Sequence, residues 1–244
     1  MERKKVLITG ASRGLGAACA LKFASMGYDV IINYNNSKEQ AEELKTKIES
    51  NYDVSVLTIK ADISNEEEVK KMIDLSLKEF GRIDCLVNNA AICCDNYFYE
   101  KSGNEFSTVL ATNLIGPFLV SKYVGESMHN NKSGCIINIS STNGIDTNEI
   151  YSMDYDASKA GVISLTKNFA KALAPYVRVN CVAPGWINKP PVLEMEPTYL
   201  EGEKKKVILE RFAEPEEIAN VVYFLATDEA SYVNGSIIRV DGGY

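Results

Sequence analysis

Short apolar runs, each bounded by turn-forming residues, recur along the chain with room for one helix between neighbours. Seven runs predict buried strands, at residues 6–8, 30–32, 54–59, 85–87, 135–139, 177–182 and 237–240. The segments between them carry apolar residues three and four positions apart, which predicts helices at about 14–26, 38–50, 66–80, 105–129, 155–173 and 215–227. Alternating strands and helices favour right-handed β-α-β crossovers, and hence a parallel sheet covered by helices on both faces.

The chain is expected to form one domain over residues 1–244. Its 244 residues contain no repeat and no linker rich in Pro, Gly or Ser. We therefore predict an α/β fold: a single-domain, doubly wound (Rossmann-type), seven-stranded parallel sheet. The least regular stretch, about 188–206, contains Pro190, Pro191 and Pro197. In such a sheet it is expected to cross the carboxyl ends of the strands as a substrate lid, where ligands bind.

Composition narrows the class of protein. The sequence is 45% hydrophobic and 24% charged, and no apolar run approaches the ~18 residues of a membrane span. The first ten residues lack the apolar core and cleavage site of a secretory signal. We therefore expect a cytoplasmic protein with no membrane partner.

Charge and metal-binding residue types exclude further functions. A formal net charge of −7 argues against a nucleic-acid partner, because neutralising phosphates needs a concentrated basic surface. The single histidine, His129, has no Cys or carboxylate cluster beside it, so no metal is expected. The six cysteines form no C-x-x-C pair, which favours reduced core thiols. Cys93 and Cys94 lie in an expected loop, and a redox-sensitive pair is the alternative for them.

A glycine-rich turn follows the first strand and opens a helix: Thr9-Gly10-Ala11-Ser12-Arg13-Gly14-Leu15-Gly16. Gly10 suits the tight turn, Gly14 lets the backbone approach a pyrophosphate, and Gly16 allows close packing of helix on strand. The helix N-terminus offers free N–H groups to phosphates. The spacing, G-x-x-x-G-x-G, is one residue longer than the commoner dinucleotide fingerprint.

The residues after the second strand favour NADP(H), with NAD(H) as the second candidate cofactor. Residues 33–36 read Asn-Tyr-Asn-Asn and lack the acid that would bind a ribose 2′-hydroxyl and repel a 2′-phosphate. Arg13 can donate to that phosphate, with Ser12 and Asn35 adding neutral hydrogen bonds, although a solvated loop cation is the alternative for Arg13. Asp62, after the third strand, suits an adenine amino group or the cap of a nearby turn.

Tyr155 and Lys159 stand four residues apart at the start of a predicted helix and so share one face. A phenol has a pKa of about 10, and a neighbouring ammonium favours the phenolate. Lys159 is therefore expected to lower the pKa of Tyr155 and make it an acid/base. Taken alone, Tyr-x-x-x-Lys is more often an ordinary helix surface.

Ser141 and Asn113 are further candidates. Ser141 follows the fifth strand at its carboxyl end, where its hydroxyl can bond a reacting oxygen. Asn113 interrupts a long helical pattern, where asparagine has low propensity and can bond locally or hold a water. Each is most often structural when it occurs in isolation.

Taken together, these residues resemble the classical short-chain dehydrogenases/reductases over essentially the whole chain. The shared motifs are Thr-Gly-x-x-x-Gly-x-Gly at 9–16, Asp62, Asn88-Asn89-Ala90, Asn113, Ser141, Tyr155-x-x-x-Lys159, Pro184-Gly185 and Val240-Asp241-Gly242-Gly243.

The resemblance implies roles for these residues. Asn113 holds a water of a proton relay, Ser141 positions the carbonyl, and Tyr155 exchanges the proton. Lys159 also binds the nicotinamide ribose. Positions lining the cofactor would include Leu15, Ile63, Asn89, Ala90, Pro184, Gly185 and Ile187. Members are typically homotetramers, and bacterial 3-oxoacyl-(acyl-carrier-protein) reductases are the most similar branch.

The chain departs from that pattern at three places. Ala91 replaces a glycine beside the nicotinamide, and Lys189 replaces the threonine that holds the carboxamide. The segment between Ser141 and Tyr155 is one residue longer than in carrier-protein reductases and carries the acids Asp146, Glu149 and Asp154. An acidic entrance repels an acidic carrier protein, with Lys132 and Arg178 as partial compensation, so small carbonyl compounds are expected to compete well with carrier-bound ones.

The expected function is an oxidoreductase that transfers hydride between NADP(H) and a carbonyl or alcohol, similar to 3-oxoacyl-thioester reductases. A general ketone, sugar or steroid dehydrogenase of the same family is the first alternative. A non-catalytic NADP-sensing protein is the second. A sugar-nucleotide epimerase shares the tyrosine–lysine pair but needs a larger carboxyl-terminal domain than 244 residues allow.

Overall fold

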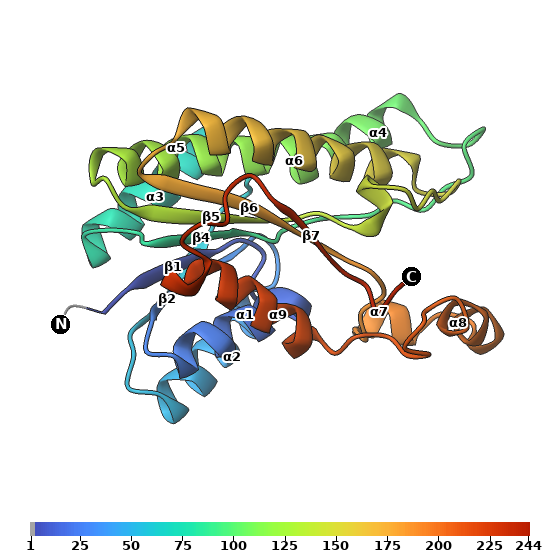
Figure 1. Ribbon diagram of the computed structural model, residues 1–244, viewed down its shortest axis with the longest axis horizontal. Coiled ribbons are helices and arrows are strands. Elements are labelled where there is room, and N and C mark those ends of the chain that lie inside the picture. Colours follow the sequence, from blue (N-terminus) through green and yellow to red (C-terminus); the bar gives the residue numbers. More distant parts are fainter. Residues whose placement is uncertain (1–2) are drawn as a thin grey trace.

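A seven-stranded, all-parallel sheet forms the centre of the molecule (Figure 1). The structure, a computed structural model, describes residues 3–244 apart from the side chains of residues 191 and 193. Met1 and Glu2, the start of the expected domain, lie outside the described residues. The strand order is β3-β2-β1-β4-β5-β6-β7, which confirms the predicted doubly wound, Rossmann-type fold. The strands are β1 Lys5–Ile8, β2 Asp29–Tyr34, β3 Val56–Lys60, β4 Cys85–Asn88, β5 Gly134–Ile139, β6 Val177–Pro184 and β7 Ile237–Val240.

The central strands are buried on both faces, which explains their uninterrupted apolar sequences. Val6, Leu7 and Ile8 of β1 are fully buried, and Leu7 pairs in register with Ile31 of β2 and Leu86 of β4. Alternate residues of one strand therefore enter different cores. Branched side chains suit these positions because they pack well on a pleated surface.

Two helical layers cover the sheet (Figure 1). On one face the core contains residues of α1 (Gly14–Ser25), α2 (Lys38–Asn51) and α9 (Pro215–Ala226). On the other face it contains residues of α3 (Glu66–Phe80), α5 (Gly116–Asn130) and α6 (Met153–Ala172). Four cysteines, at 19, 85, 135 and 181, are buried free thiols of these layers. No helix within residues 3–244 has the length and apolar character that a membrane crossing requires.

The helix expected over 105–129 differs from that prediction. It begins earlier, at α4 (Gly103–Leu110), because Ser102 and Glu105 form a reciprocal capping box. It then passes through a π-helical turn, η1 (Ala111–Ile115), before continuing as α5. Pro117 has no N–H for the carbonyl of Asn113 four residues earlier, and its ring crowds that carbonyl. This interruption accounts for the widened turn around Asn113.

The segment expected as an irregular lid contains two short helices, α7 (Pro190–Leu193) and α8 (Pro197–Lys204). Both lie beyond the carboxyl ends of the strands, at the right of Figure 1. A small core of its own supports this region, in which the Trp186 and Phe212 rings stack with centroids 5.4 Å apart. Two 3-10 turns, η2 (Thr142–Gly144) and η3 (Asp228–Ala230), complete the described elements.

Candidate active site

The glycine-rich turn joins β1 to α1 at the carboxyl edge of the sheet. Gly10 and Gly14 have φ of +60° and +57°, a left-handed conformation that favours glycine. A Cβ on Gly16 would lie 2.5 Å from the carbonyl oxygen of Gly10, so this glycine permits the close contact of helix and turn. A Cβ on Gly14 would meet nothing within 4 Å, so the turn is open on that side.

The N-terminus of α1 is available to an anion. Arg13 occupies the N-cap position with an extended backbone, and its side chain does not cap the helix. The first turn contains no acidic residue, and Leu15 and Gly16 are buried at its base. Uncapped N–H groups and the positive end of the helix dipole suit a pyrophosphate. Arg13 is exposed beside this turn, and Ser12 is partly exposed.

Polar side chains fix the turn to the neighbouring strand. The Thr9 hydroxyl accepts hydrogen bonds from the amides of Asn89 (3.0 Å) and Ala90 (3.1 Å). The Asn89 side-chain amide donates to the carbonyls of Thr9 and Gly10, both at 3.0 Å. The carboxyl ends of β1 and β4 therefore form one rigid cradle around the glycine turn.

The two residues expected near adenosine lie at the ends of β2 and β3. Asn35 is exposed directly after β2. The Asp62 carboxylate accepts hydrogen bonds from the Ser64 amide (2.9 Å) and hydroxyl (2.7 Å). Asp62 thus caps a local turn, which was the alternative to an adenine contact. Both bonds use one carboxylate oxygen, Oδ1. Ile63 is buried and packs against Gly116 of α5.

The residues after β6 close the opposite side of the edge. Pro184 is buried at the end of β6, and the Gly185 amide donates to Val240 of β7 over 3.1 Å. Ile187 is 7% exposed and pairs with Ala213. Lys189 caps α7 through its extended backbone. Burial lowers the pKa of Lys189, and its charge in turn lowers the pKa of Lys159, which places the two ammonium groups within electrostatic range.

Tyr155 and Lys159 project from the first turns of α6. Lys159 is 3% exposed, and its ammonium donates to the carbonyl of Ile139, the last residue of β5, over 2.9 Å. The Lys159 Nζ lies 5.4 Å from the centre of the Tyr155 ring. The structure thus brings the predicted pair together at the carboxyl end of β5.

The net shift of the Tyr155 pKa in this structure is upward, opposite in direction to the lowering expected from Lys159. Burial raises the pKa of the Tyr155 phenol, and a hydrogen bond from Ser141 lowers it only in part. Burial also lowers the pKa of Lys159, to about 8. Both shifts favour the uncharged forms, because burial removes water from each group. Tyr155 is therefore held as a protonated phenol, the form that an acid requires.

Ser141 lies between β5 and α6, as its place in the sequence predicted. It begins η2, and its hydroxyl accepts from the Asn143 amide over 3.2 Å. Its bond toward Tyr155 affects the pKa of that phenol, so the two hydroxyl groups face one another. Two hydroxyl groups at this edge of the sheet can donate to one carbonyl oxygen.

The Asn113 side chain takes neither of the two roles expected of it, a bond within its own helix or a contact with a water. The side-chain amide, fully buried, accepts from the Ile92 amide and donates to the Ile92 carbonyl, both at 2.8 Å. It also donates to Ser158 of α6 over 3.2 Å. Asn113 therefore ties the loop after β4 to α6. Its main-chain carbonyl receives no bond from position 117, because Pro117 has no N–H.

Three residues near Tyr155 were not assigned to the active site from the sequence. After burial, the nearby Cys93 is the next cause that raises the pKa of Tyr155, and the Cys93 thiol donates to the Asp95 carboxylate over 2.9 Å. Lys101 and Asp154 form an ion pair of 2.8 Å behind Tyr155. No short motif links these residues, since Lys101 and Asp154 stand 53 positions apart.

The acidic entrance expected from the 142–154 segment is weaker in the structure. Asp154 is fully buried against Lys101, and Asp146 pairs with Arg239 over 2.7 Å. Glu149 remains partly exposed. Arg178 donates to the carbonyls of Thr227 and Val233, so it holds a loop and leaves the entrance without its positive charge.

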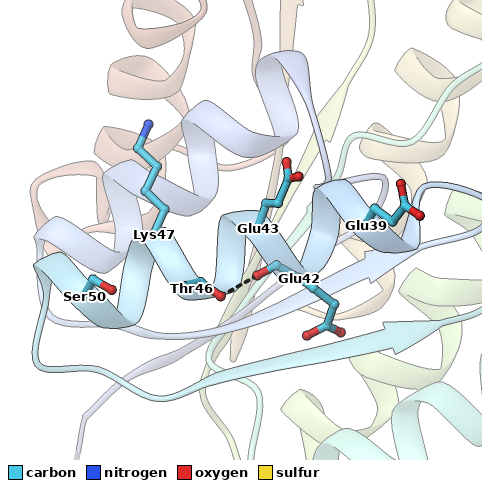
Figure 2. A pocket seen from close by; sticks show the side chains of 6 residues that line it. All are labelled: Glu39, Glu42, Glu43, Thr46, Lys47 and Ser50. Carbon is cyan, nitrogen blue, oxygen red and sulfur yellow. Dashed lines mark hydrogen bonds between the residues drawn. The ribbon is translucent and has the colours of Figure 1, made fainter.

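A surface hollow lies elsewhere, along α2 (Figure 2). Its lining comes from that helix alone: Glu39, Glu42, Glu43, Thr46, Lys47 and Ser50. The Thr46 hydroxyl donates to the Glu42 carbonyl over 2.9 Å, a bond within the helix. The hollow contains none of the predicted site residues and is no part of the candidate site.

Comparisons with known proteins identify the family. A family model described as enoyl-(acyl carrier protein) reductase matches residues 10–244. The chain is 40% identical over 241 residues to the 3-oxoacyl-(acyl-carrier-protein) reductase FabG of Staphylococcus epidermidis, covering 98% of both chains. It is 39% identical over 250 residues to FabG of Thermotoga maritima, covering 100% of this chain and 98% of that protein. The crystal structure of levodione reductase superposes with a TM-score of 0.93 at 36% identity, covering 98% of this chain and 96% of that one.

Fold, order of motifs and full-length similarity agree. The chain belongs to the short-chain dehydrogenase/reductase family and is an oxidoreductase that acts on CH–OH groups with a nicotinamide cofactor.

Proposed function

We propose that this protein is an NADP(H)-dependent reductase of carbonyl compounds, with Tyr155 as its proton donor. One observation carries the proposal: the phenol of Tyr155, kept protonated by burial, shares the carboxyl end of β5 with Ser141 and with the ammonium of Lys159. An acid, a second hydroxyl donor and a cation meet where doubly wound sheets bind ligands.

The residues at the edge of the sheet fit a dinucleotide. The open side of Gly14 and the uncapped start of α1 suit the pyrophosphate, and Arg13 suits a 2′-phosphate. Asp62 and Ile63 would border the adenine, and Asn35 the adjoining ribose. The nicotinamide end would lie along Asn89, Ala90, Pro184, Gly185 and Ile187, with Lys159 at its ribose. When bound, NADPH supplies the hydride that reduces the carbonyl carbon.

The chain's own residues handle the oxygen and the proton. Ser141 and Tyr155 donate hydrogen bonds to the carbonyl oxygen and hold it in line. As the carbon is reduced, the Tyr155 proton moves to the oxygen, which gives the alcohol. The Lys159 ammonium stabilises the resulting phenolate, and a water held at the Asn113 carbonyl returns a proton. Acid catalysis of this kind contributes about 10²–10⁴-fold.

The proposed substrates are 3-oxoacyl thioesters and related small ketones, supported by the full-length similarity to 3-oxoacyl-(acyl-carrier-protein) reductases. The segment 188–206, with α7 and α8 beyond the strand ends, is proposed as the substrate lid within one domain of residues 1–244. We further propose a cytoplasmic homotetramer, the assembly expected of the family.

The proposal is tested by mixing the purified protein with NADPH or NADH and one carbonyl of each class. The panel consists of acetoacetyl-CoA, a small β-ketoester, a quinone, a keto-sugar and a steroid ketone. Oxidation of the cofactor is followed with the protein in excess over the cofactor. We expect NADPH-dependent reduction of the β-keto compounds. No oxidation of NADPH with any carbonyl, together with tight NADPH binding, would instead identify a cofactor-sensing protein.

A further inference from the structure

The loop between β4 and α4 forms one wall beside Tyr155, and its aromatic rings pack on one another and on Tyr151 but belong to neither core of the sheet. We call residues 92–101 the rim segment. Its rings range from partly to largely exposed: Tyr97, Phe98 and Tyr99 are 38%, 41% and 82% exposed. A segment with few buried apolar contacts opens easily unless polar contacts fix it.

A buried ion pair fixes the far end of this segment. The Lys101 ammonium lies 2.8 Å from the carboxylate of Asp154, with side chains only 5% and 0% exposed. Each of the other ion pairs described between residues 3 and 244 has at least one side chain that is 35% or more exposed. The same ammonium also donates to the carbonyl of Cys94. Lys101 therefore closes the rim segment into a loop against Asp154.

Asp154 also contacts Tyr155 directly. It lies in the first turn of α6, and its second carboxylate oxygen accepts from the Tyr155 amide over 2.9 Å. The negative charge also suits the positive end of the helix dipole. Nearby, the Asn96 amide donates to the Tyr151 carbonyl over 3.0 Å, which adds a second link between the rim segment and the approach to Tyr155.

We propose that Lys101 and Asp154 are positioning residues for the reductase reaction: their buried pair holds the rim segment and the first turn of α6 in the arrangement that aligns Tyr155 with its substrate. This inference rests on the proposed function. Taking two charges out of water is costly, and two apolar residues of similar size often stabilise a fold as well or better. What the pair adds here is a fixed geometry, with one ammonium bound to Asp154 and to Cys94 at once.

The test compares Lys101→Met, Asp154→Asn and the double variant with the wild-type protein. Lys70→Met, which breaks an exposed pair with Glu67, is the matched control. Melting temperature, NADPH affinity, kcat and KM are measured on each. Alkylation of Cys93 and Cys94 by iodoacetamide is followed by peptide mass spectrometry, with the four buried thiols as internal references.

Each single variant is expected to lose about 100-fold in kcat through misalignment of Tyr155, while NADPH affinity stays within about twofold of wild type. Alkylation of Cys94 should accelerate about tenfold as the rim segment opens. The double variant leaves no unpaired buried charge, so its melting temperature should return toward wild type. Its kcat should stay low and its Cys94 exposed, because the geometry is still missing.

Two results would overturn the inference. The first is a double variant whose kcat recovers together with its melting temperature, since the pair would then serve stability alone. The second is a set of single variants with wild-type kcat and wild-type alkylation. The alkylation measurement requires no turnover. A wild-type protein that is inactive on every carbonyl would refute the proposed function. The alkylation rates of Cys93 and Cys94 would still decide whether the ion pair holds the rim segment.

Discussion

The ammonium of Lys159 lies 5.4 Å from the centre of the Tyr155 ring, one helical turn further along the same face of α6. It is buried, and it reaches past the ring to the carbonyl that ends β5. A charged group in such a place is costly to the fold and useful to a reaction that creates a phenolate.

That cost predicts a stabilising substitution. Burial lowers the pKa of Lys159 to about 8, whereas an unfolded lysine titrates near 10.4. Below pH 8 both states carry the proton, and the folded state bears the full penalty. Lys159→Met should therefore raise the free energy of unfolding at pH 7 by up to about 3 kcal/mol, at 1.36 kcal/mol per pKa unit, while abolishing turnover.

Urea unfolding at pH 7 and pH 10 checks this, with the exposed Lys171→Met on the same helix as the control. Between about pH 8 and 10.4 the unfolded wild-type chain holds a proton that the folded one has lost, so wild-type stability rises with pH and the advantage of Lys159→Met shrinks. A variant that is less stable than wild type at pH 7 would contradict the account.

The same titration predicts the pH dependence of the reaction. The reductive kcat/KM should fall as pH rises through about 8, because Lys159 loses the charge that stabilises the phenolate. Oxidation of the alcohol needs a deprotonated Tyr155, whose pKa burial raises, so its rate should climb with pH. In Lys159→Arg, which stays charged over this range, residual reduction should show no such fall. A reductive profile that is flat to pH 9.5 in the wild type would count against this role.

The sequence predicted the sheet because each central strand is an apolar run buried on both faces, and it predicted the glycine turn because Gly10 and Gly14 need positive φ. It did not predict what the Asn113 side chain bonds, since Asn113 is held by Ile92 across the loop, a contact that no local pattern encodes. Contacts between residues distant in the sequence, such as Lys101 with Asp154, were missed for the same reason.

Cofactor choice is predicted to depend on Arg13, which lies exposed beside the start of α1. Removing one charge-assisted contact to a 2′-phosphate costs ~1.5–3 kcal/mol, or roughly 10- to 150-fold. Arg13→Ala should lose that factor in kcat/KM for NADPH and keep its kcat/KM for NADH, which serves as the internal control. Equal use of NADPH and NADH by the wild type would refute the predicted preference.

Carrier-bound substrates are predicted to have no large electrostatic advantage. Two arginines of the described structure are already engaged, since Arg178 donates to carbonyls within the fold and Asp146 pairs with Arg239. The ratio of kcat/KM for acetoacetyl-carrier protein over acetoacetyl-CoA should stay below the ~10²-fold that steering can supply. Both substrates are compared at moderate and high salt. A large preference for the carrier that collapses in high salt would show a docking surface missing from this description.

The central claim, that Tyr155 donates the proton, is tested most directly by Tyr155→Phe, with the fully exposed Tyr232→Phe as the control. The measurement is kcat for NADPH-dependent reduction of the best carbonyl, together with the NADPH dissociation constant. The account predicts a loss of at least about 10² in kcat at unchanged NADPH affinity for Tyr155→Phe, and wild-type values for Tyr232→Phe. Near-wild-type turnover by Tyr155→Phe would contradict it.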